Sequence, residues 1–296
     1  MKFSIITPSY NQGKYIERTL KSVLSQEGVT FEYIIFDGGS TDQTIDILNI
    51  YALSHSKQMR WISEKDRGQT HAINKGISIT SGEIIGWLNS DDVYYTDALR
   101  VVADYFAAHP EVDVVYGSAD HIDTDDRYID SYPVEQWNIQ RMRETCIICQ
   151  PAAFFRRRVV ESHGLLDESL DYCMDYEFWL RLGSAGIRFS QINRKLAGSR
   201  MYAQNKTLGS TRAVHAEIND MMKKKFGRAP DSLLFAYAHV VAEECLDRNR
   251  YPRLFLYLYG AQAFFAAWRW NGRISREMCR KFLTRFVAWL AKKSNE

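Results

Sequence analysis

The chain has 296 residues, of which 46% are hydrophobic and 25% are charged, values ordinary for a soluble globular protein. Its formal net charge of +2 is too small to make nucleic acid the expected main partner, so we expect no nucleic-acid binding. A chain of this length can form one large α/β domain with a smaller appendage.

Two kinds of segment alternate along the first 123 residues. Short apolar runs predict buried strands, and longer segments with apolar residues at helical intervals predict helices. The predicted strands are 2–7, 31–37, 59–64, 83–89 and 112–123, and the predicted helices are 14–26, 40–52, 69–80 and 97–110. Ser40 stands three residues before Gln43, a spacing that predicts a capping box at the start of the second helix.

Strands that are apolar almost throughout and alternate with helices indicate a parallel sheet covered on both faces. The ligands of such sheets bind beyond the carboxyl ends of the strands. Polar or charged residues follow four of the predicted strands at this end, in residues 7–10, at Asp37, in residues 64–67, and at Asp91 and Asp92. We therefore expect these four loops to converge on one crevice.

The second half of the chain is less regular. Residues 150–164 predict a strand followed by a helix, residues 171–186 predict a helix, and only helical patterns follow from about residue 214. The expected organisation is therefore an α/β domain in residues 1–212 and a helical region in residues 213–296.

The five cysteines are scattered and odd in number, which argues against a disulfide framework and fits a reducing compartment. Cys146 and Cys149 form a CxxC pair, but no second Cys or His pair follows at zinc-finger spacing. We expect these thiols to be structural. The amino terminus shows no signal-peptide pattern, so a cytoplasmic location is expected.

Asp91 and Asp92 stand side by side directly after the apolar run 83–89. Two like charges at such a short distance repel each other, and each loses hydration when it is partly buried. A positive partner is therefore expected. One alternative is a plain turn, because residues 89–92 are turn-forming types. The other is a divalent cation such as Mg²⁺ or Mn²⁺, which takes oxygen ligands and keeps phosphate oxygens in its shell.

Five segments, in this order and spacing, resemble the family 2 glycosyltransferases of GT-A fold: TPSYNQGKYIERTLKSVLSQ, DGGSTDQT, SEKDRGQTHAINKGI, GWLNSDDVYY and MDYEFWLRLGSAG. The resemblance covers roughly residues 2–210. It implies a mostly parallel Rossmann-type sheet flanked by helices, with nucleotide-sugar binding and catalysis in residues 1–212. It also implies inverting, metal-dependent transfer of a sugar from a nucleotide-diphosphate donor to a saccharide or lipid-linked acceptor, in surface polysaccharide biosynthesis.

Carried over position by position, the resemblance makes Asp92 the ligand of a Mg²⁺ or Mn²⁺ cofactor. It places Asp91 against the ribose or the water shell of the metal. It also assigns the contacts to the nucleobase and ribose to the loop that holds Thr7, Pro8 and Tyr10.

Asp37 matches the first acid of the family's frequent DDGS segment, and Gly38 stands in place of the second acid. A contact to the base that is often made there is missing, so the sequence leaves the nucleotide open. Arg67 is expected to contact the diphosphate, and Gly68 lets the backbone approach closely. The alternative is a charged helix start, with Asp66 near its amino terminus.

Asp175 is the predicted catalytic base. The segment MDYEFWLRL matches the family pattern E-D-x-x-x-W, with Met174 in place of the first acid. Inversion needs a carboxylate that takes the proton of the acceptor hydroxyl, and apolar neighbours would raise its pKa towards a useful range. The alternative places Asp175 and Glu177 on the solvent face of an amphipathic helix. Trp179 either lines the acceptor site or packs in the core.

The family's R-x-H segment reads Arg200, Met201, Tyr202 here, so Tyr202 stands where a histidine can complete the metal shell. A neutral phenol is a poor ligand. The expected shell is then Asp92, the diphosphate and water, while Arg200 and Lys206 are expected to neutralise the diphosphate.

Residues 254–268 are uncharged, but these 15 residues fall short of the roughly 20 needed to span a bilayer. Residues 275–293 place Met278, Phe282, Phe286 and Trp289 on one side of a predicted helix, with Arg and Lys on the others. This pattern is typical of a helix on anionic lipid and predicts peripheral contact with the inner face of the plasma membrane. The alternative is packing on the catalytic domain or on another subunit.

Two other functions fit a similar sheet and acidic pair. A nucleotidyltransferase would carry a Gly-rich loop with Lys or Arg straight after the first strand, which TPSYNQG lacks. A non-catalytic module would bind a nucleotide sugar in the same crevice. The sequence does not identify the donor sugar, the acceptor or the oligomeric state.

Overall fold

The structure is a computed structural model that describes the backbone of residues 1–293 and the side chains of residues 1–284. It divides into two compact units. The first comprises Met1–Met142 and Cys146–Asn205, and the second comprises Arg143–Thr145 and the chain from Lys206 onwards. The units divide at residue 205, whereas the sequence predicts a boundary after residue 212.

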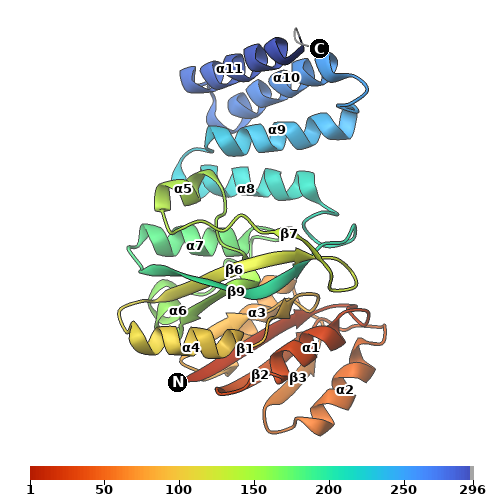
Figure 1. Cartoon of the computed structure of the whole chain (residues 1–296), viewed down its shortest axis with the longest axis vertical. Helices are drawn as coiled ribbons and strands as arrows, with labels where there is room; N and C mark the ends of the chain where they lie inside the picture. Colours follow the sequence, from red (N-terminus) through yellow and green to blue (C-terminus); the bar gives the residue numbers. More distant parts are fainter. Residues whose placement is uncertain (294–296) are drawn as a thin grey trace. The chain divides into compact units, whose positions relative to one another are not determined.

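The first unit contains a mostly parallel sheet with helices on both faces (Figure 1). Its strands lie in the order β3-β2-β1-β4-β8-β6-β9-β5, and β7 pairs with β6. The strands are β1 (Lys2–Ser9), β2 (Thr30–Asp37), β3 (Met59–Ser63), β4 (Ile84–Trp87), β5 (Val93–Tyr94), β6 (Val114–Ile122), β7 (Tyr128–Ser131), β8 (Ala153–Arg156) and β9 (Phe189–Arg200). β1, β2, β3 and β4 are mutually parallel, β9 is parallel to β6, and β5, β7 and β8 pair antiparallel with their neighbours. The predicted α/β fold class is confirmed.

Helices cover both faces because both faces of the central strands are apolar. The helices are α1 (Ile16–Leu24), α2 (Thr44–Ser54), α3 (Gln69–Ile79), α4 (Ala98–Ala108), α6 (Arg157–His163) and α7 (Met174–Ser184), with the 3-10 helix η1 (Gln150–Ala152), and α5 (Ile139–Glu144) at the division between the units. Phe3 and Ile5 of β1 pack in one cluster with Leu20 of α1. Ile6 points to the opposite face, where it lies against Gly76 of α3.

The register of the parallel strands brings the carboxyl ends of β1, β2, β3 and β4 to one edge of the sheet. Ser9 lies opposite Asp37, and Asp37 lies opposite Ser63, so three strands end side by side. Ile6 of β1 lies opposite Trp87, the last residue of β4. The chain order of the strands reverses at β1 and β4, where open α/β sheets bind their ligands. The four loops therefore share one edge, as the sequence predicts.

The sequence does not predict β5, β7 or β9. β9 is 12 residues long, but its middle exposes Asn193, Arg194 and Lys195. It therefore lacks the continuous apolar run that reveals a buried strand. Its end is buried again and carries Arg200 to the edge described above.

The described part of the second unit is helical. Its helices are α8 (Thr211–Phe226), α9 (Asp231–Cys245), α10 (Pro252–Asn271) and α11 (Arg276–Lys293). Over the described residues, no helix combines the length and the apolar character needed to cross a membrane.

The described start of α11 packs within its own unit. Met278 is buried, and the ring of Phe282 lies 5.4 Å from the ring of Phe264 and against Gly260. The sequence predicts that Met278 and Phe282 contact lipid, but both pack inside the second unit, which agrees with the packing alternative. Phe286 and Trp289 lie outside the residues whose side chains the structure describes.

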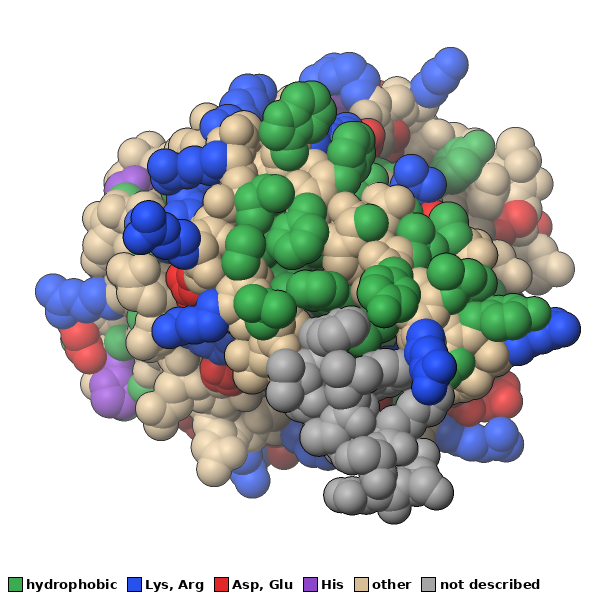
Figure 2. Space-filling view, turned by 90° about the horizontal axis from the view of Figure 1, so that it is seen from above, with side chains coloured by type: hydrophobic (Ala, Val, Ile, Leu, Met, Phe, Trp, Pro, Cys, Tyr) green, Lys and Arg blue, Asp and Glu red, His purple; other side chains and the backbone are tan. Residues whose placement is uncertain are grey.

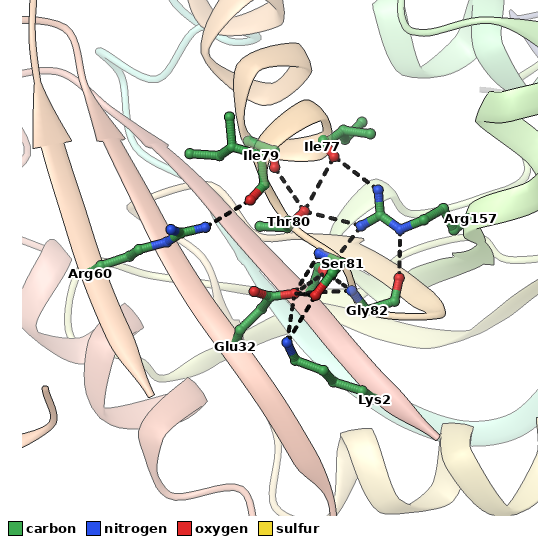
Figure 3. Close-up of polar contacts among 11 residues, drawn as sticks. Lys2, Glu32, Arg60, Ile77, Ile79, Thr80, Ser81, Gly82 and Arg157 are labelled. Carbon is green, nitrogen blue, oxygen red and sulfur yellow. Dashed lines mark hydrogen bonds and ion pairs between the residues drawn. The ribbon is translucent and has the colours of Figure 1, made fainter. Parts of the chain in front are cut away.

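A polar cluster ties the end of α3 to the edge of the sheet opposite the candidate site (Figure 3). The Oε1 atom of Glu32 accepts hydrogen bonds from the backbone N–H groups of Ser81 at 2.7 Å and Gly82 at 2.9 Å, and from the Ser4 hydroxyl at 2.9 Å. The Lys2 ammonium lies 3.2 Å from the same oxygen. Burial alone would raise the pKa of Glu32, but these partners together outweigh it and lower the pKa to about 2.

Arg157 at the start of α6 completes the same cluster. Its guanidinium donates to the carbonyls of Gly82 at 2.7 Å and Ile77 at 2.9 Å, and to the hydroxyl of Thr80 at 3.1 Å. The turn between α3 and β4 is thus held from both sides of the sheet edge by Glu32 and Arg157.

We predict that Glu32→Gln lowers the free energy of unfolding by about 1–3 kcal/mol at pH 7, because the amide cannot accept the same charge-assisted hydrogen bonds. Since the folded pKa is depressed to about 2, the stabilisation is present above the unfolded value of 4.5 and is lost as the pH falls towards 2. Urea unfolding of both proteins between pH 3 and pH 7 should therefore show a difference that shrinks in acid. The exposed Glu27 supplies the control; a Glu27→Gln variant with an equal, pH-dependent loss would contradict the account.

Candidate active site

The loop after β4 holds the two adjacent carboxylates. Asp92 is buried, and its Oδ1 accepts a hydrogen bond of 2.8 Å from the backbone N–H of Arg200 at the end of β9. Its Oδ2 accepts one of 3.2 Å from the side chain of Asn89. Its carbonyl accepts one from the Thr19 hydroxyl of α1. Asp92 therefore joins its loop to both α1 and β9.

Arg200 is buried, and its guanidinium bonds to protein oxygens. Nε donates to the carbonyl of Asp91 at 2.7 Å, Nη1 donates to the carbonyl of Asp123 at 2.6 Å, and Nη2 donates to the carboxylate of Asp126. The Arg200 side chain thus holds its own loops from inside the protein, and its predicted neutralisation of a diphosphate stays a prediction. Lys206, the other predicted partner, belongs to the second unit and stays a prediction.

Asp91 is half-buried and faces Tyr202, which follows β9. Its Oδ2 accepts a hydrogen bond of 2.8 Å from the Tyr202 hydroxyl. The Tyr202 ring lies 4.8 Å from the ring of Tyr15, just before α1. The position at which the resemblance expects a histidine thus holds a phenol that donates to the acidic pair.

Both carboxylates of the pair are disfavoured in their charged form. Burial and the charge of Asp91 raise the pKa of Asp92, and the N–H of Arg200 opposes this only in part. Burial also raises the pKa of Asp91, against the hydrogen bond from Tyr202. A cation beside the pair would favour the ionised form of both side chains.

Mg²⁺ or Mn²⁺ fits this set of donors. Such ions are commonly held by one or two carboxylates, while water and substrate phosphate oxygens fill the other positions. Among the residues that the structure describes, no three His, Cys, Asp or Glu side chains come together in a group that could hold a metal. The acidic pair would thus supply only part of the ligand shell of such an ion.

Asp37, the last residue of β2, organises the loop that follows it. Its Oδ2 accepts hydrogen bonds from the N–H groups of Gly39 at 3.0 Å and Ser40 at 2.8 Å, and from the Ser63 hydroxyl at 2.7 Å. Its Oδ1 accepts one from the Ser40 hydroxyl. The predicted capping box is therefore wrong, because Ser40 bonds to Asp37 and α2 begins only at Thr44.

The predicted nucleoside-binding residues at the end of β1 differ in exposure. Thr7 is buried, with its hydroxyl 3.0 Å from the hydroxyl of Tyr33, and Pro8 is buried as well. Tyr10 is exposed. Among these three positions, Tyr10 presents its ring at the surface, while Thr7 and Pro8 shape the end of the strand.

Gly38 lies beside a carboxylate from another loop. A Cβ atom at Gly38 would lie 3.1 Å from Oδ2 of Asp66 and 3.4 Å from the ring of Tyr10. The other oxygen of Asp66 accepts a hydrogen bond of 2.8 Å from the N–H of Gly68. Asp66 thus brings a carboxylate close to the position whose own acid is missing. The sequence gives no signal of this, because two separate loops supply the two residues.

Arg67 lies at the surface beside α3. Its Nη2 pairs with the carboxylate of Glu168 at 2.6 Å, and Asn74 of α3 donates to the same carboxylate at 3.1 Å. Gly68 has φ +112°, a conformation that L side chains rarely adopt. This glycine turns the chain from the loop into α3 and leaves the Arg67 side chain exposed.

Asp175 lies in the first turn of α7 and is half-buried. Burial raises the pKa of the Cys149 thiol, and the charges of Asp92 and Asp175 add to this effect. Charges from two distant segments, Asp92 after β4 and Asp175 on α7, thus act on the same buried thiol.

The two acids of α7 have different surroundings. Glu177 is buried and pairs with Arg181 at 3.0 Å. The alternative in which Asp175 and Glu177 share a solvent face is therefore wrong. Trp179 is buried too, and its ring stacks on Trp87 of β4 at 5.9 Å. It packs in the core rather than lining an acceptor site.

The two thiols of the CxxC pair are unreactive because they stay protonated. Burial raises the pKa of Cys146 to about 12 and also raises the pKa of Cys149, so both remain neutral thiols. This agrees with the predicted structural role.

Known sequences match parts of the chain. The family model described as glycosyl transferase family 2 matches residues 4–164, more than half of the chain. A chondroitin synthase of Escherichia coli is 30% identical over 207 residues, which are 69% of this chain and 30% of that protein. A PGL/p-HBAD biosynthesis glycosyltransferase of Mycobacterium bovis is 31% identical over 180 residues, which are 60% of this chain and 68% of that protein. The chain thus spans less than a third of the chondroitin synthase.

Solved structures share the fold. TarS 1–349 of S. aureus, in complex with UDP-GlcNAc, superposes with a TM-score of 0.62 at 18% identity, over 88% of this chain and 80% of that chain. The mannosyltransferase PcManGT of Pyrobaculum calidifontis, in complex with GDP-Man and Mn²⁺, gives 0.60 at 18% identity, over 97% of this chain and 80% of that chain. At this identity the likeness establishes the fold alone.

We predict that Arg200→Lys lowers the free energy of unfolding by about 2–4 kcal/mol, because an ammonium cannot reach the three protein oxygens that the guanidinium binds. Urea unfolding followed by far-UV circular dichroism measures the loss. Arg194→Lys is the matched control, since Arg194 lies exposed on the same strand, and it should leave the stability unchanged. Equal stabilities for the two variants would refute the anchoring role of Arg200.

Proposed function

The chain belongs to glycosyl transferase family 2 and is a glycosyltransferase, and from this premise we propose how it works. The proposed reaction moves a sugar from a nucleotide-diphosphate donor to a hydroxyl of a saccharide or lipid-linked acceptor, with inversion at the anomeric carbon. Membership of the family favours this reaction over nucleotidyl transfer and over binding without catalysis.

One observation carries the proposal. The acidic pair Asp91 and Asp92 stands at the edge where the strand order reverses, which is where open α/β sheets bind their ligands. An acidic pair at this edge would hold a metal ion beside the departing diphosphate, as an inverting transfer from a diphosphate needs.

Two structures of the same fold contain UDP-GlcNAc and GDP-Man, which supports a nucleotide-sugar donor. We assign the exposed ring of Tyr10 to the nucleobase, because aromatic faces stack on bases. Asp66 supplies the carboxylate that Gly38 lacks. Arg67 is assigned to the diphosphate, with which a guanidinium forms charge-assisted hydrogen bonds.

Three predicted site residues support the side chains assigned to the donor. Thr7 and Pro8 lie near the end of β1, shortly before Tyr10 in the chain. Asp37 holds the backbone of its loop in place through the N–H groups of Gly39 and Ser40. We therefore assign these three predicted site residues a positioning role in donor binding.

Asp175 is assigned as the general base. The acceptor oxygen attacks the anomeric carbon, the bond from that carbon to the diphosphate oxygen breaks, and the proton of the acceptor hydroxyl passes to the Asp175 carboxylate. The nucleotide diphosphate leaves with the electron pair of the broken bond. Because the attack comes from the face opposite the leaving group, the anomeric configuration inverts.

The acidic pair is assigned to Mg²⁺ or Mn²⁺. When bound, the ion neutralises negative charge on the departing diphosphate. We assign the direct contact to Asp91, because Asp91 is half-buried while Asp92 is buried and bound to the N–H of Arg200. The resemblance assigns this contact to Asp92 instead. The Tyr202 hydroxyl is assigned to hold Asp91 in place.

Relatives named chondroitin synthase and hyaluronan synthase support a place in polysaccharide biosynthesis. The matched segments make up 30% of the chondroitin synthase and 19% of the hyaluronan synthase. A saccharide acceptor is therefore proposed on the basis of a part of each relative.

The donor and the metal dependence are tested together. Hydrolysis of UDP- and GDP-sugars, measured with and without Mn²⁺, should identify a donor that is cleaved slowly only with the metal. Asp91→Asn should then weaken Mn²⁺-dependent binding of that donor at least about tenfold, because a ligand of the ion is lost. Asp92→Asn should retain more of this binding, since an amide oxygen can still accept from the N–H of Arg200. The reverse order would return the ligand role to Asp92.

The mechanism is tested at Asp175. Asp175→Asn should reduce kcat by about 10²- to 10⁴-fold, while the donor affinity stays within a few-fold, because a base is lost and the donor contacts are kept. The product should carry the anomeric configuration opposite to that of the donor, as NMR can determine.

Asp46→Asn is the matched control for this variant. Asp46 also stands in the first turn of a helix, but it lies exposed on α2. Full activity of the Asp46 variant is expected. A retained anomeric configuration, or an active Asp175→Asn protein, would remove Asp175 from the proposed role.

A further inference from the structure

The helix α10 has an inner and an outer face. Its inner face packs against α9, with the ring of Tyr259 5.8 Å from that of Phe235 and the ring of Trp270 4.8 Å from that of Tyr237. Contacts of this kind hold the helices of the second unit together.

The outer face of α10 is apolar as well. It carries Leu254, Tyr257, Phe265 and Trp268, which we call the α10 stripe, and each of them is between 52% and 65% exposed. Their spacing places them on one side of the helix, along about 21 Å of its length. Figure 2 shows hydrophobic side chains gathered on the face that carries the C-terminal helices, with Lys and Arg and some Asp and Glu side chains around them.

The charged side chains that lie near the stripe in the sequence are mostly positive, although Arg269 lines a pocket together with Glu243 and Glu244 of α9. Within residues 251–284 the basic side chains are Arg253, Arg269, Arg273, Arg276, Arg280 and Lys281, and the acidic one is Glu277. The five arginines are exposed, and Lys281 pairs with Glu277 at 2.8 Å. An apolar stripe bordered by cations is complementary to a surface that is apolar inside and anionic outside.

We propose that the α10 stripe docks on an anionic lipid bilayer, with α10 lying in the plane of the membrane. Tyr and Trp are suited to this position, because their rings place an apolar body in the acyl region and a polar edge in the headgroup region. The basic side chains beside the stripe meet the anionic headgroups. The proposal goes beyond the proposed reaction and does not depend on it.

The same charges argue against a second copy of the chain on this face. Two copies paired through the stripe would bring both sets of arginines together, and like charges at close range repel. The site of contact also differs from the one the sequence suggests, because the predicted residues Met278 and Phe282 of α11 pack within the unit.

Sedimentation with lipid vesicles tests the proposal on the full chain. Vesicles of phosphatidylcholine mixed with phosphatidylglycerol should bind the protein at an ionic strength of about 0.05 M, and binding should fall at about 0.5 M because salt screens the headgroup contacts. Phosphatidylcholine alone should bind more weakly. Phe265→Glu combined with Trp268→Glu should weaken binding at least about tenfold.

Ile50→Glu combined with Leu53→Glu is the matched control. These residues are also exposed, apolar and three positions apart on a helix, but they belong to α2 of the first unit. This control should bind vesicles like the parent, and thermal unfolding should show that both double variants remain folded. Arg273→Glu with Arg276→Glu should reduce the preference for phosphatidylglycerol while it keeps the stripe.

Three outcomes would overturn the proposal. These are no binding to phosphatidylglycerol vesicles at low ionic strength, equal binding by the stripe variant and its control, and self-association in solution that the stripe variant abolishes. The last result would assign the stripe to contact between copies of the chain.

Discussion

A buried hydrogen bond between the Asp92 carboxylate and the backbone N–H of Arg200 joins the loop after β4 to the end of β9. The guanidinium of Arg200 binds the carbonyl of Asp91 beside it, and Thr19 of α1 binds the carbonyl of Asp92. The acidic pair is therefore held by two elements, α1 and β9, that lie far from it and from each other in the sequence. Carboxylates that are disfavoured in their charged form need such support to remain at a fixed position.

The acidic residues of the candidate site fall into two groups, those that hold their own loops and those that a ligand can reach. Asp37 and Asp92 accept hydrogen bonds from backbone N–H groups and thereby hold their own loops. Asp91, Asp66 and Asp175 are half-buried, where a ligand can reach them. A site of this kind combines rigid loops with half-buried carboxylates, the groups to which we assign metal binding and proton transfer.

The helices of the second unit carry apolar side chains both between them and on an exposed face. Its helices bury aromatic side chains between them, yet α10 keeps a second apolar face outside that packing. A helix that only served as a cover for its neighbours would place polar residues there. The exposed basic side chains of α10 and α11 fit the contact with anionic lipid that we propose for this face.

The sequence by itself determined the order of the central strands and helices, the common edge of their loops, and the acidic pair at 91 and 92, because these follow from local periodicity and from the geometry of parallel strands. Tertiary structure alone decided that Arg200 is buried as an anchor, that Glu177 is buried while Asp175 is half-buried, and that Asp66 lies beside Gly38. Each of these depends on contacts between segments distant in the chain. Local patterns cannot report such contacts, since the identity of a residue does not state which distant backbone group it will meet.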